Sequence, residues 1–398
     1  MKISLVSPAS LPATQFGGIL FLMLDIAREA SNLGHDVTLY TTDLDFANNP
    51  HTFNKSLPKK EKIDNFYIMR SHVWFYIQLF FVNPGMYFQM MRDTPDVIHT
   101  IGLRSFQSFV AAIVAKKKNI PLIISDQGGL TTHPDLTDNS ILQKLLYRLQ
   151  LPFIKFIIRQ ASKIIVANEY EKQIFLDKRL SLENTEKISI IKNGVNISSL
   201  TTITPNFKEK YDIDMPFILF LGRFARVKGI DILLNSIKII KDTNFSKQIK
   251  FVIMGVDFGF QEQMFDMIKK FNLEDIVCVI KNPNRDDVIA AYRETEFLVL
   301  PSRWELSPLT PLEGFVFKKS VISTNVHGIP STITNGKNCV LVENEDFQNL
   351  AIQIMKLFDN PKEYMKLGQA GYELVFKECN SKFMTEKILN VYDNLINR

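Results

Sequence analysis

Two glutamates in the second half of the chain lie where a predicted strand leads into a predicted helix. Glu305 and Glu313 have seven residues between them and follow the apolar run 297–300, which predicts a buried strand. Pro308 and Pro311 between them are typical of a helix start. We therefore expect one glutamate in the loop and the other in the helix. A carboxylate accepts hydrogen bonds from hydroxyl groups, so each can hold one sugar ring, with solvated surface glutamates as the alternative.

Backbone groups at the same helix start suit a phosphate. The amides of Leu309 and Thr310 are expected in the first helical turn. Unpaired N–H groups and the helix dipole favour an anion at such a position. Ser307, just before them, is a further candidate for substrate binding.

Two cations follow another predicted strand. The run 217–221 leads into Gly222-Arg223, and Lys228-Gly229 comes just before a predicted helix. Because open α/β sheets bind ligands at the carboxyl ends of their strands, both cations are expected at such an edge. A guanidinium can bond two phosphate oxygens and an ammonium adds a point charge, so together they would offset a diphosphate. A pair of solvated loop cations is the alternative.

A glycine pair lies at the first predicted strand-to-helix turn. Gly17 and Gly18 come after the strand 2–6 and before the helical pattern 19–32. Glycine lets the backbone approach a pyrophosphate closely at a helix start. Glycines are equally common in tight turns for steric reasons, so both interpretations stay open.

Short apolar runs alternate with helical patterns along nearly the whole chain, which is typical of parallel sheets covered by helices. The predicted fold class is therefore α/β. Expected helices include 19–32 and 104–117, and helical patterns fill 346–376 and 381–397. The predicted strands are 2–6, 37–41, 96–99, 121–125, 163–167, 188–191, 217–221, 250–254, 277–280, 297–300, 320–323 and 340–342.

Length and composition favour two domains in a reducing compartment. A chain of 398 residues exceeds one ordinary α/β core, and the polar stretch 193–202 is the predicted junction. The net charge of +5 suits phosphates or membrane headgroups and is too small to indicate nucleic acid. Three widely spaced cysteines indicate neither a disulfide framework nor a zinc site, and the opening strand leaves no room for a secretion signal. We therefore expect a cytoplasmic location.

Together these motifs resemble those of the retaining GT-B glycosyltransferases known as family GT4. The resemblance spans nearly the whole chain and is carried by Gly17-Gly18, Gly222-Arg223, Lys228-Gly229, Glu305 and Glu313, Val321–Asn325 and Gly328-Ile329-Pro330. It implies two Rossmann-like domains facing a central cleft. The acceptor-side domain would be 1–195 and the donor domain 196–380, with the last helix, 381–398, crossing back to the first domain.

The resemblance also implies roles for the residues of a nucleotide-sugar site. These are Arg223 and Lys228 for the diphosphate, Glu305 for hydroxyls of the donor sugar, Glu313 for the ribose, Leu309 and Thr310 for phosphate, and Gly18 for the same phosphates from across the cleft. Base recognition is expected near Lys281 and Asn282, after the strand 277–280. Because the groups are divided between domains, closure would complete the site and exclude water.

One segment departs from the family pattern. Many relatives carry a histidine at the end of a first-domain strand, near the transferred sugar, where this chain has Gln127. Glutamine can bond a sugar hydroxyl but cannot carry a proton near neutral pH. An acid/base role would therefore fall elsewhere. Asp126, His99 and His133 are the candidates.

The family mechanism requires no protein nucleophile and no cofactor. The sugar leaves as an oxocarbenium-like species, and the acceptor hydroxyl attacks from the same face while the leaving diphosphate takes its proton. No metal is expected, because the six histidines show no ligand spacing. The alternatives are an epimerase or phosphorylase-like enzyme on the same architecture, or a catalytically silent nucleotide-sugar-binding subunit.

The sequence does not distinguish between UDP-, GDP- and ADP-sugars as the donor. It does not distinguish between glycans, lipid-linked sugars and small molecules as the acceptor.

Two stretches bear on membrane contact. The uncharged stretch 71–91 is broken at 83–85, so each half is too short to span a bilayer, and two buried segments are expected there. The stretch 142–163 combines apolar residues with basic charge alone, which suits either an interfacial helix or a packed one. Peripheral contact with the inner face of a membrane is therefore a hypothesis.

Overall fold

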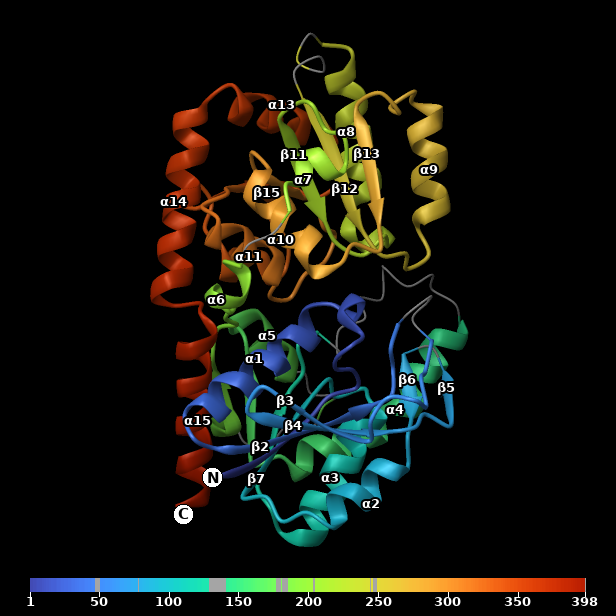
Figure 1. Ribbon diagram of the computed structural model, residues 1–398, viewed down its shortest axis with the longest axis vertical. Coiled ribbons are helices and arrows are strands. Elements are labelled where there is room, and N and C mark those ends of the chain that lie inside the picture. The colour runs from blue at the N-terminus through green and yellow to red at the C-terminus, as the bar shows by residue number, and fades with distance from the viewer. Residues whose placement is uncertain are drawn as a thin grey trace. The chain divides into compact units, whose positions relative to one another are not determined.

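The chain divides into two compact units (Figure 1). Unit 1 comprises Met1–Gly194 and Ser381–Arg398, and unit 2 comprises Val195–Asn380. These junctions lie within one residue of the predicted domain boundaries. The computed structural model describes residues 1–46, 51–77, 79–128, 141–176, 180, 185–202, 205–243, 245 and 249–397, with the backbone alone for 141–147.

Unit 1 is built on an eight-stranded sheet in the order β10-β9-β8-β7-β1-β2-β4-β3. Neighbours are parallel except β3 and β4, which form an antiparallel edge. The strand order reverses between β1 and β7, which makes their carboxyl ends the topological switch point of this sheet. The strands are β1 (Lys2–Val6), β2 (Asp36–Thr42), β3 (Lys60–Ile63), β4 (Phe66–Ser71), β7 (Val97–Ile101), β8 (Leu122–Ser125), β9 (Lys163–Val166) and β10 (Ile188–Ile190).

Helices join these strands, and the last helix of the chain belongs to unit 1. It packs against the first helix, where the Ser381 hydroxyl donates to Glu29 at 2.7 Å. Unit 1 also holds a separate two-stranded antiparallel hairpin, β5 (Phe75–Ile77) and β6 (Phe80–Val82). The helices are η1 (Thr14–Phe16), α1 (Gly18–Asn32), α2 (Gly85–Met91), α3 (Phe106–Lys118), α4 (Ile141–Gln160), α5 (Glu169–Phe175), η3 (Thr185–Lys187) and α15 (Ser381–Ile396).

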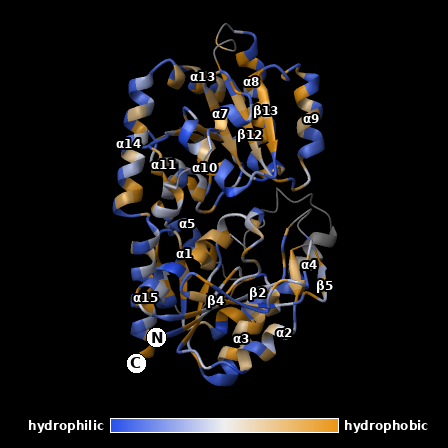
Figure 2. Ribbon diagram, viewed as in Figure 1, coloured by the Kyte–Doolittle hydropathy of each residue, from blue (hydrophilic) through white to orange (hydrophobic). Residues whose placement is uncertain are grey.

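Unit 2 is built on a six-stranded, all-parallel sheet in the order β13-β12-β11-β14-β15-β16. The strands are short apolar runs, as expected where helices cover both faces of a parallel sheet. Figure 2 shows β12 and β13 largely in the hydrophobic colour. The strands are β11 (Phe217–Leu221), β12 (Lys250–Gly255), β13 (Val277–Lys281), β14 (Leu298–Leu300), β15 (Val321–Thr324) and β16 (Cys339–Val342).

The helices of unit 2 follow its strands in turn. Several begin at an asparagine or aspartate whose side chain accepts from an amide of the first turn, as Asn284 does from Asp287. The helices are α6 (Ile197–Leu200), α7 (Phe207–Lys210), η4 (Arg226–Lys228), α8 (Ile230–Lys241), α9 (Gln261–Lys270), α10 (Arg285–Glu294), α11 (Leu309–Val316), α12 (Ile329–Thr332), α13 (Phe347–Phe358) and α14 (Pro361–Lys377).

All twelve predicted strands are present, so the α/β class is confirmed. The helical pattern 346–376 is two helices, because Pro361 begins a new one after the Asn360 cap. The expectation of two buried segments in 71–91 is wrong for the first segment, because all three residues of β5 are exposed. The second segment is largely buried, through Phe81 and Val82 of β6 and Met86 and Met90 of α2.

In the part of the chain that the structure describes, no helix is both long enough and apolar enough to cross a bilayer.

Candidate functional site

The strand order of unit 2 brings two of the predicted site segments together. β11 and β14 are neighbours at the point where the order reverses, so the loops after them share one switch point. Lys228 ends the short helix after β11, and Glu305 lies in the loop after β14. The Lys228 ammonium lies 2.5 Å from the Glu305 carboxylate, which also accepts from the Ser302 hydroxyl at 3.1 Å. Both side chains of the ion pair are more than four-fifths buried, so water screens it weakly.

Two glycines let the loops after β11 and β15 approach the loop after β14. Gly229 has φ 68°, and a Cβ there would lie 1.9 Å from the carbonyl oxygen of Pro301. A Cβ on Gly328 would lie 1.6 Å from the Leu306 carbonyl oxygen, and the Gly328 amide donates to the Glu305 carbonyl at 3.0 Å. A side chain at either position would push the loops apart. These glycines of the sequence motif therefore fix where the Lys228–Glu305 pair lies.

A residue that sequence reasoning missed, Arg303, also connects the two loops. Its guanidinium forks onto both oxygens of Asp231 at 2.7 and 2.8 Å and onto Glu345 at 2.5 and 2.8 Å. It donates to the Arg226 carbonyl at 2.7 Å as well. Burial lowers the Arg303 pKa, but the hydrogen bonds to the two carboxylates outweigh burial and raise it. Arg303 is thus a permanent cation that holds the Lys228 segment in place.

Glu313 has partners of its own. It lies in α11 and is 8% exposed. One carboxylate oxygen accepts from Arg285 at 2.6 Å and the other from the Tyr292 hydroxyl at 2.8 Å. Burial raises the pKa of Tyr292 well above its usual value, so its hydroxyl stays protonated and donates. Since a carboxylate has about four acceptor positions, the predicted ribose contact stays a prediction that this geometry permits.

The start of α11 offers open backbone donors. Pro308 is its cap residue, and no side chain in the described part of the chain caps this end. Leu309 and Thr310 are the first two helical residues, while Pro311 has no N–H to offer. The two predicted amides are therefore the ones left for an anion. Ser307 is half-buried in the loop just before them.

The remaining predicted donor residues of unit 2 follow β11 and β13. Arg223 comes two residues after β11, is exposed, and lies with its guanidinium 5.0 Å from the Phe258 ring centroid. Lys281 ends β13 with its ammonium 5.9 Å from the Phe265 ring. Asn282 has φ 51° and donates its amide to Gly255 at 2.8 Å. All three lie at the carboxyl edge of the sheet, and their contacts with a nucleotide stay predictions.

The glycine pair of unit 1 lies after β1, beside the switch point of the first sheet. Gly17 is the cap residue of α1, with φ 100°, and Gly18 is the first residue of that helix. A Cβ on Gly17 would meet no atom within 4 Å among the described residues. The helix start is therefore open. Because Gly18 belongs to unit 1, its predicted contact with the donor phosphates stays a prediction.

Gln127 follows β8 in a left-handed conformation with φ 54°. Its side-chain amide and that of Asn193 bond each other reciprocally, at 2.9 and 2.8 Å. Its backbone amide donates to the buried carboxylate of Glu171 at 3.0 Å, and that carboxylate also accepts from Ala167 at 2.5 Å. Burial and the neighbouring Asp126 raise the pKa of Glu171 to about 8. Gln127 is thus held at both its side chain and its backbone.

His99 and Asp126 are both deeply buried in unit 1. His99 is 1% exposed on β7, and its two ring nitrogens bond the hydroxyls of Tyr392 at 2.6 Å and Ser125 at 2.9 Å. Burial lowers its pKa to about 3, so the ring stays neutral. Asp126 is 2% exposed and accepts from the Leu103 amide at 3.2 Å. Their predicted acid/base roles stay predictions, and His133 lies outside the described residues.

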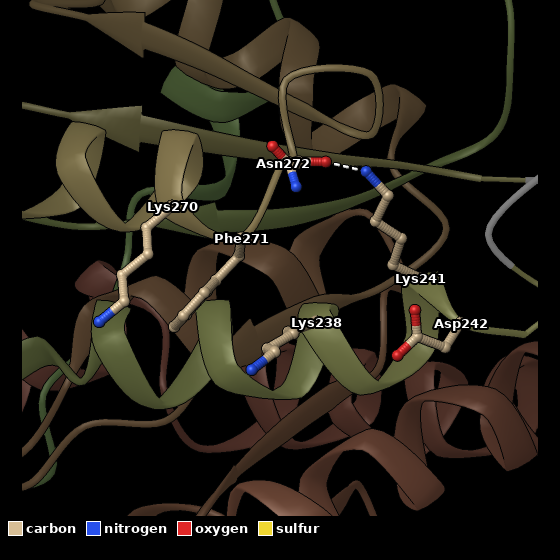
Figure 3. A pocket seen from close by; sticks show the side chains of 6 residues that line it. All are labelled: Lys238, Lys241, Asp242, Lys270, Phe271 and Asn272. Carbon is tan, nitrogen blue, oxygen red and sulfur yellow. Dashed lines mark hydrogen bonds between the residues drawn. The ribbon is translucent and has the colours of Figure 1, made fainter.

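A surface hollow of 340 Å³ in unit 2 lies away from these residues (Figure 3). Three lysines line it, at the ends of α8 and α9. Both helices end at the amino edge of the sheet, opposite the switch point. Lys241 donates to the Asn272 carbonyl and pairs with Asp275 at 3.1 Å. The hollow is therefore a cluster of helix-end cations and not part of the candidate site.

Among the described residues, no group of three histidine, cysteine or acidic side chains is placed to hold a metal ion. Metal independence stays a prediction.

Comparisons with known proteins agree with this geometry. Residues 204–374 match the family described as Glycosyl transferases group 1, and residues 16–199 match Glycosyltransferase Family 4. An uncharacterized glycosyltransferase of Methanocaldococcus jannaschii is 30% identical over 73% of this chain and 73% of its own length. The chain belongs to the group 1 glycosyltransferases.

Two further relatives extend these comparisons. The capsular polysaccharide biosynthesis glycosyltransferase CapM of Staphylococcus aureus is 25% identical, and the match covers 59% of this chain and 62% of CapM, which is less than two thirds of it. The structure of Anabaena HepE in complex with UDP-glucose aligns with a TM-score of 0.74 at 16% identity, covering 99% of this chain and 100% of HepE. The fold is GT-B, and the chain is a glycosyltransferase.

Proposed function

We propose that this glycosyltransferase moves a sugar from a nucleotide-sugar donor to an acceptor hydroxyl, and that the carboxyl edge of unit 2 binds the donor. One observation carries the proposal. The Lys228–Glu305 pair lies at the β11–β14 switch point, and the loop that holds Glu305 leads into the open start of α11. The UDP-glucose bound in the HepE structure supports a nucleotide sugar as the donor class.

Each group of the edge has a chemical part in this proposal. Lys228 and Arg223 stabilise the charge that grows on the diphosphate as the bond between it and the anomeric carbon breaks. The amides of Leu309 and Thr310 donate to the same phosphates. Glu305, already paired with Lys228, keeps free lone pairs for sugar hydroxyls and fixes the ammonium in position. The carboxylate thus orients both the sugar and the cation.

The stereochemical course we propose is retention. The acceptor oxygen forms its bond to the anomeric carbon on the face that the diphosphate leaves, and the acceptor proton passes to a diphosphate oxygen. No protein nucleophile and no metal enters this sequence. The neutral, core-buried His99 takes no part in the proton transfer.

The acceptor we propose is a glycan or lipid-linked sugar, met by the protein at the inner face of a membrane. The name of the CapM relative, which refers to capsular polysaccharide biosynthesis, supports a glycan acceptor. An exposed apolar hairpin of unit 1 supports membrane contact and is considered below.

The test is release of nucleoside diphosphate by the purified chain from a panel of UDP-, GDP- and ADP-sugars, with oligosaccharide and lipid-linked acceptors. We expect acceptor-dependent release from one nucleotide class, unaffected by EDTA, and a product whose anomeric proton coupling matches that of the donor. An altered nucleotide sugar formed without acceptor would instead indicate an epimerase. Donor binding with neither hydrolysis nor transfer would indicate a silent subunit.

A further inference from the structure

The β5–β6 hairpin of unit 1 exposes an unusual set of large apolar side chains. Consecutive residues are exposed on both faces of β5, whereas a strand lying on a core exposes alternate residues. The exposed fractions are 71% for Trp74, 56% for Phe75, 47% for Tyr76, 57% for Ile77 and 41% for Leu79. The hairpin is therefore an arm that projects from unit 1, and we call Trp74–Ile77 with Leu79 the apolar arm.

The base of this arm is fixed in the core of unit 1. Phe81 is fully buried and Val82 is 7% exposed. The Trp74 amide donates to the Val82 carbonyl at 2.8 Å, and the Gln107 side chain donates to the Phe81 carbonyl at 2.8 Å. Phe53 meets Phe81 edge to face at 5.3 Å between ring centroids. Packing and hydrogen bonds at the base thus fix the arm in a position where its side chains are exposed.

Helix α4 and the hairpin both pack on α3. Phe106 of α3 contacts Phe80 of the hairpin, with ring centroids 6.2 Å apart. Phe109, one turn further along α3, contacts Phe153 of α4 at 5.2 Å. Phe153 is itself 52% exposed, and Leu149 before it is 59% exposed. The arm and α4 thus each carry exposed apolar side chains and are each anchored on α3.

Charge on this surface has one sign. The sequence of α4 holds four basic residues and no acidic residue, and the stretch 71–91 holds no formal charge. Arg148 and Arg159 are exposed. Exposed cations beside apolar side chains match the chemistry of an anionic lipid surface.

We propose that the apolar arm and α4 form a membrane-docking surface whose occupant is an anionic lipid bilayer. Lipid surrounds an inserted arm, so it covers both faces of β5 at once, whereas a flat protein surface covers one. Trp74 and Tyr76 are the side-chain types that settle at the headgroup level. A three-residue strand spans about 10 Å, which matches the depth of about 5–10 Å reached by interfacial elements. The unpaired strand edge keeps the arm out of the hydrocarbon core.

The first experiment uses the tryptophans of the full chain as probes. The chain has two, Trp74 in the arm and Trp304 in unit 2, so Trp304→Phe leaves the arm as the sole emitter. We expect its emission to shift to the blue on adding vesicles of phosphatidylglycerol and phosphatidylcholine, and to be quenched by acyl-chain-brominated lipid. Trp74→Phe should abolish both changes. Unchanged Trp74 emission at saturating lipid would overturn the proposal.

The second experiment measures co-sedimentation with the same vesicles. The double variant Phe75→Ser, Ile77→Ser should partition more weakly by at least about tenfold, since two large apolar side chains are lost from the interface. The matched control, Ile352→Ser with Met365→Ser, removes exposed apolar side chains from unit 2 and should sediment like the wild type. Unaltered melting temperatures show that both variants fold.

Two outcomes would contradict the proposal of an anionic bilayer as the occupant. Wild-type dimers in lipid-free sedimentation equilibrium that the arm variant abolishes would make the arm an interface between two copies of this chain. Equal binding to purely zwitterionic vesicles would remove α4 from the surface. The proposal does not rest on the donor site, because lipid binding is read without any nucleotide sugar.

Discussion

The carboxyl edges of the two sheets use their polar residues in opposite ways. In unit 2, Lys228 and Glu305 pair across the switch point while keeping access to solvent. In unit 1, the comparable residues face inward: His99 and Asp126 are within the core, and Gln127 is bonded to Asn193. One edge presents charged groups to a ligand, and the other uses its polar groups to fix the shape of its own loops.

This difference shows that two sheets with a similar topology can carry different functional groups at their switch points. Both sheets bring loops to a switch point, and at that of unit 2 the described residues hold the Lys228–Glu305 ion pair beside the open start of α11. Unit 1 offers the open start of α1 at its own switch point. The donor is therefore proposed to be held mainly by unit 2, and the following variants test this division.

The largest effect is expected from Lys228→Ala. The variant removes the cation proposed to stabilise the leaving diphosphate and leaves the partly buried Glu305 without its partner, so turnover should fall about a hundredfold or more. The measurement is the rate of nucleoside diphosphate release. Lys241→Ala, a lysine at the opposite edge of the same sheet, is the control and should stay near wild type. Wild-type turnover in Lys228→Ala would contradict the proposal that the carboxyl edge of unit 2 holds the donor.

Arg303→Lys should have the next largest effect. A lysine cannot reproduce the two bidentate contacts with Asp231 and Glu345, each a charge-assisted interaction of about 1.5–3 kcal/mol. We expect kcat/KM to fall about tenfold and the melting temperature to drop. Arg293→Lys, an exposed arginine of the same unit, serves as the control. If Arg303→Lys kept full activity, Arg303 would not position the Lys228 loop.

Smaller changes are expected from the amide pair of unit 1. Gln127→Ala and Asn193→Ala should each lower the free energy of unfolding by about 1 kcal/mol, and the double variant should lose little more, because either change breaks the same two bonds. Chemical denaturation measures all three. Fully additive losses would show that Gln127 and Asn193 act independently. A drop in kcat confined to Gln127→Ala would support its predicted place beside the sugar.

The smallest effect is a pH dependence of stability from Glu171. Its folded pKa of about 8 lies above the usual glutamate value of 4.5, so the folded state binds more protons between these values. Stability from this group is therefore greatest at low pH and is lost as pH rises toward 8. Melting temperature should fall with pH across that window and fall less in Glu171→Gln. Glu169→Gln, an exposed residue of the same helix, should keep the wild-type slope.

Much of the fold was predictable because it is local. Most of the parallel strands are short segments rich in apolar residues, as is typical of strands that helices cover on both faces. Two strands of the first sheet, β3 and β4, were not predicted from the sequence. The first of them, β3, reads Lys-Glu-Lys-Ile and lies at the antiparallel edge, so it has no apolar run to indicate it. The hairpin was assigned to the core because apolar content in a sequence does not report which side chains lack a covering element.

The sequence indicated which segments of the chain form the candidate site, but not which side chains pair with each other there. The segments that hold Lys228, Glu305 and Glu313 carry the glycines and prolines of the sequence motifs. Their partners lie far away in sequence, as with Lys228 and Glu305, which are 77 residues apart. Arg303 had no local signal, because Asp231 and Glu345 meet it only in the folded unit. The burial of His99 follows from its place inside a central parallel strand, which helices cover on both faces.

The most direct measurement is a thermal-shift screen of UDP-, GDP- and ADP-sugars on the wild type, Lys228→Ala and Lys241→Ala. A ligand that binds the folded state raises its melting temperature. We predict that one nucleotide class raises the melting temperature of the wild type and of Lys241→Ala, and that Lys228→Ala loses most of the shift. The same shift in all three proteins would contradict donor binding at the carboxyl edge of unit 2.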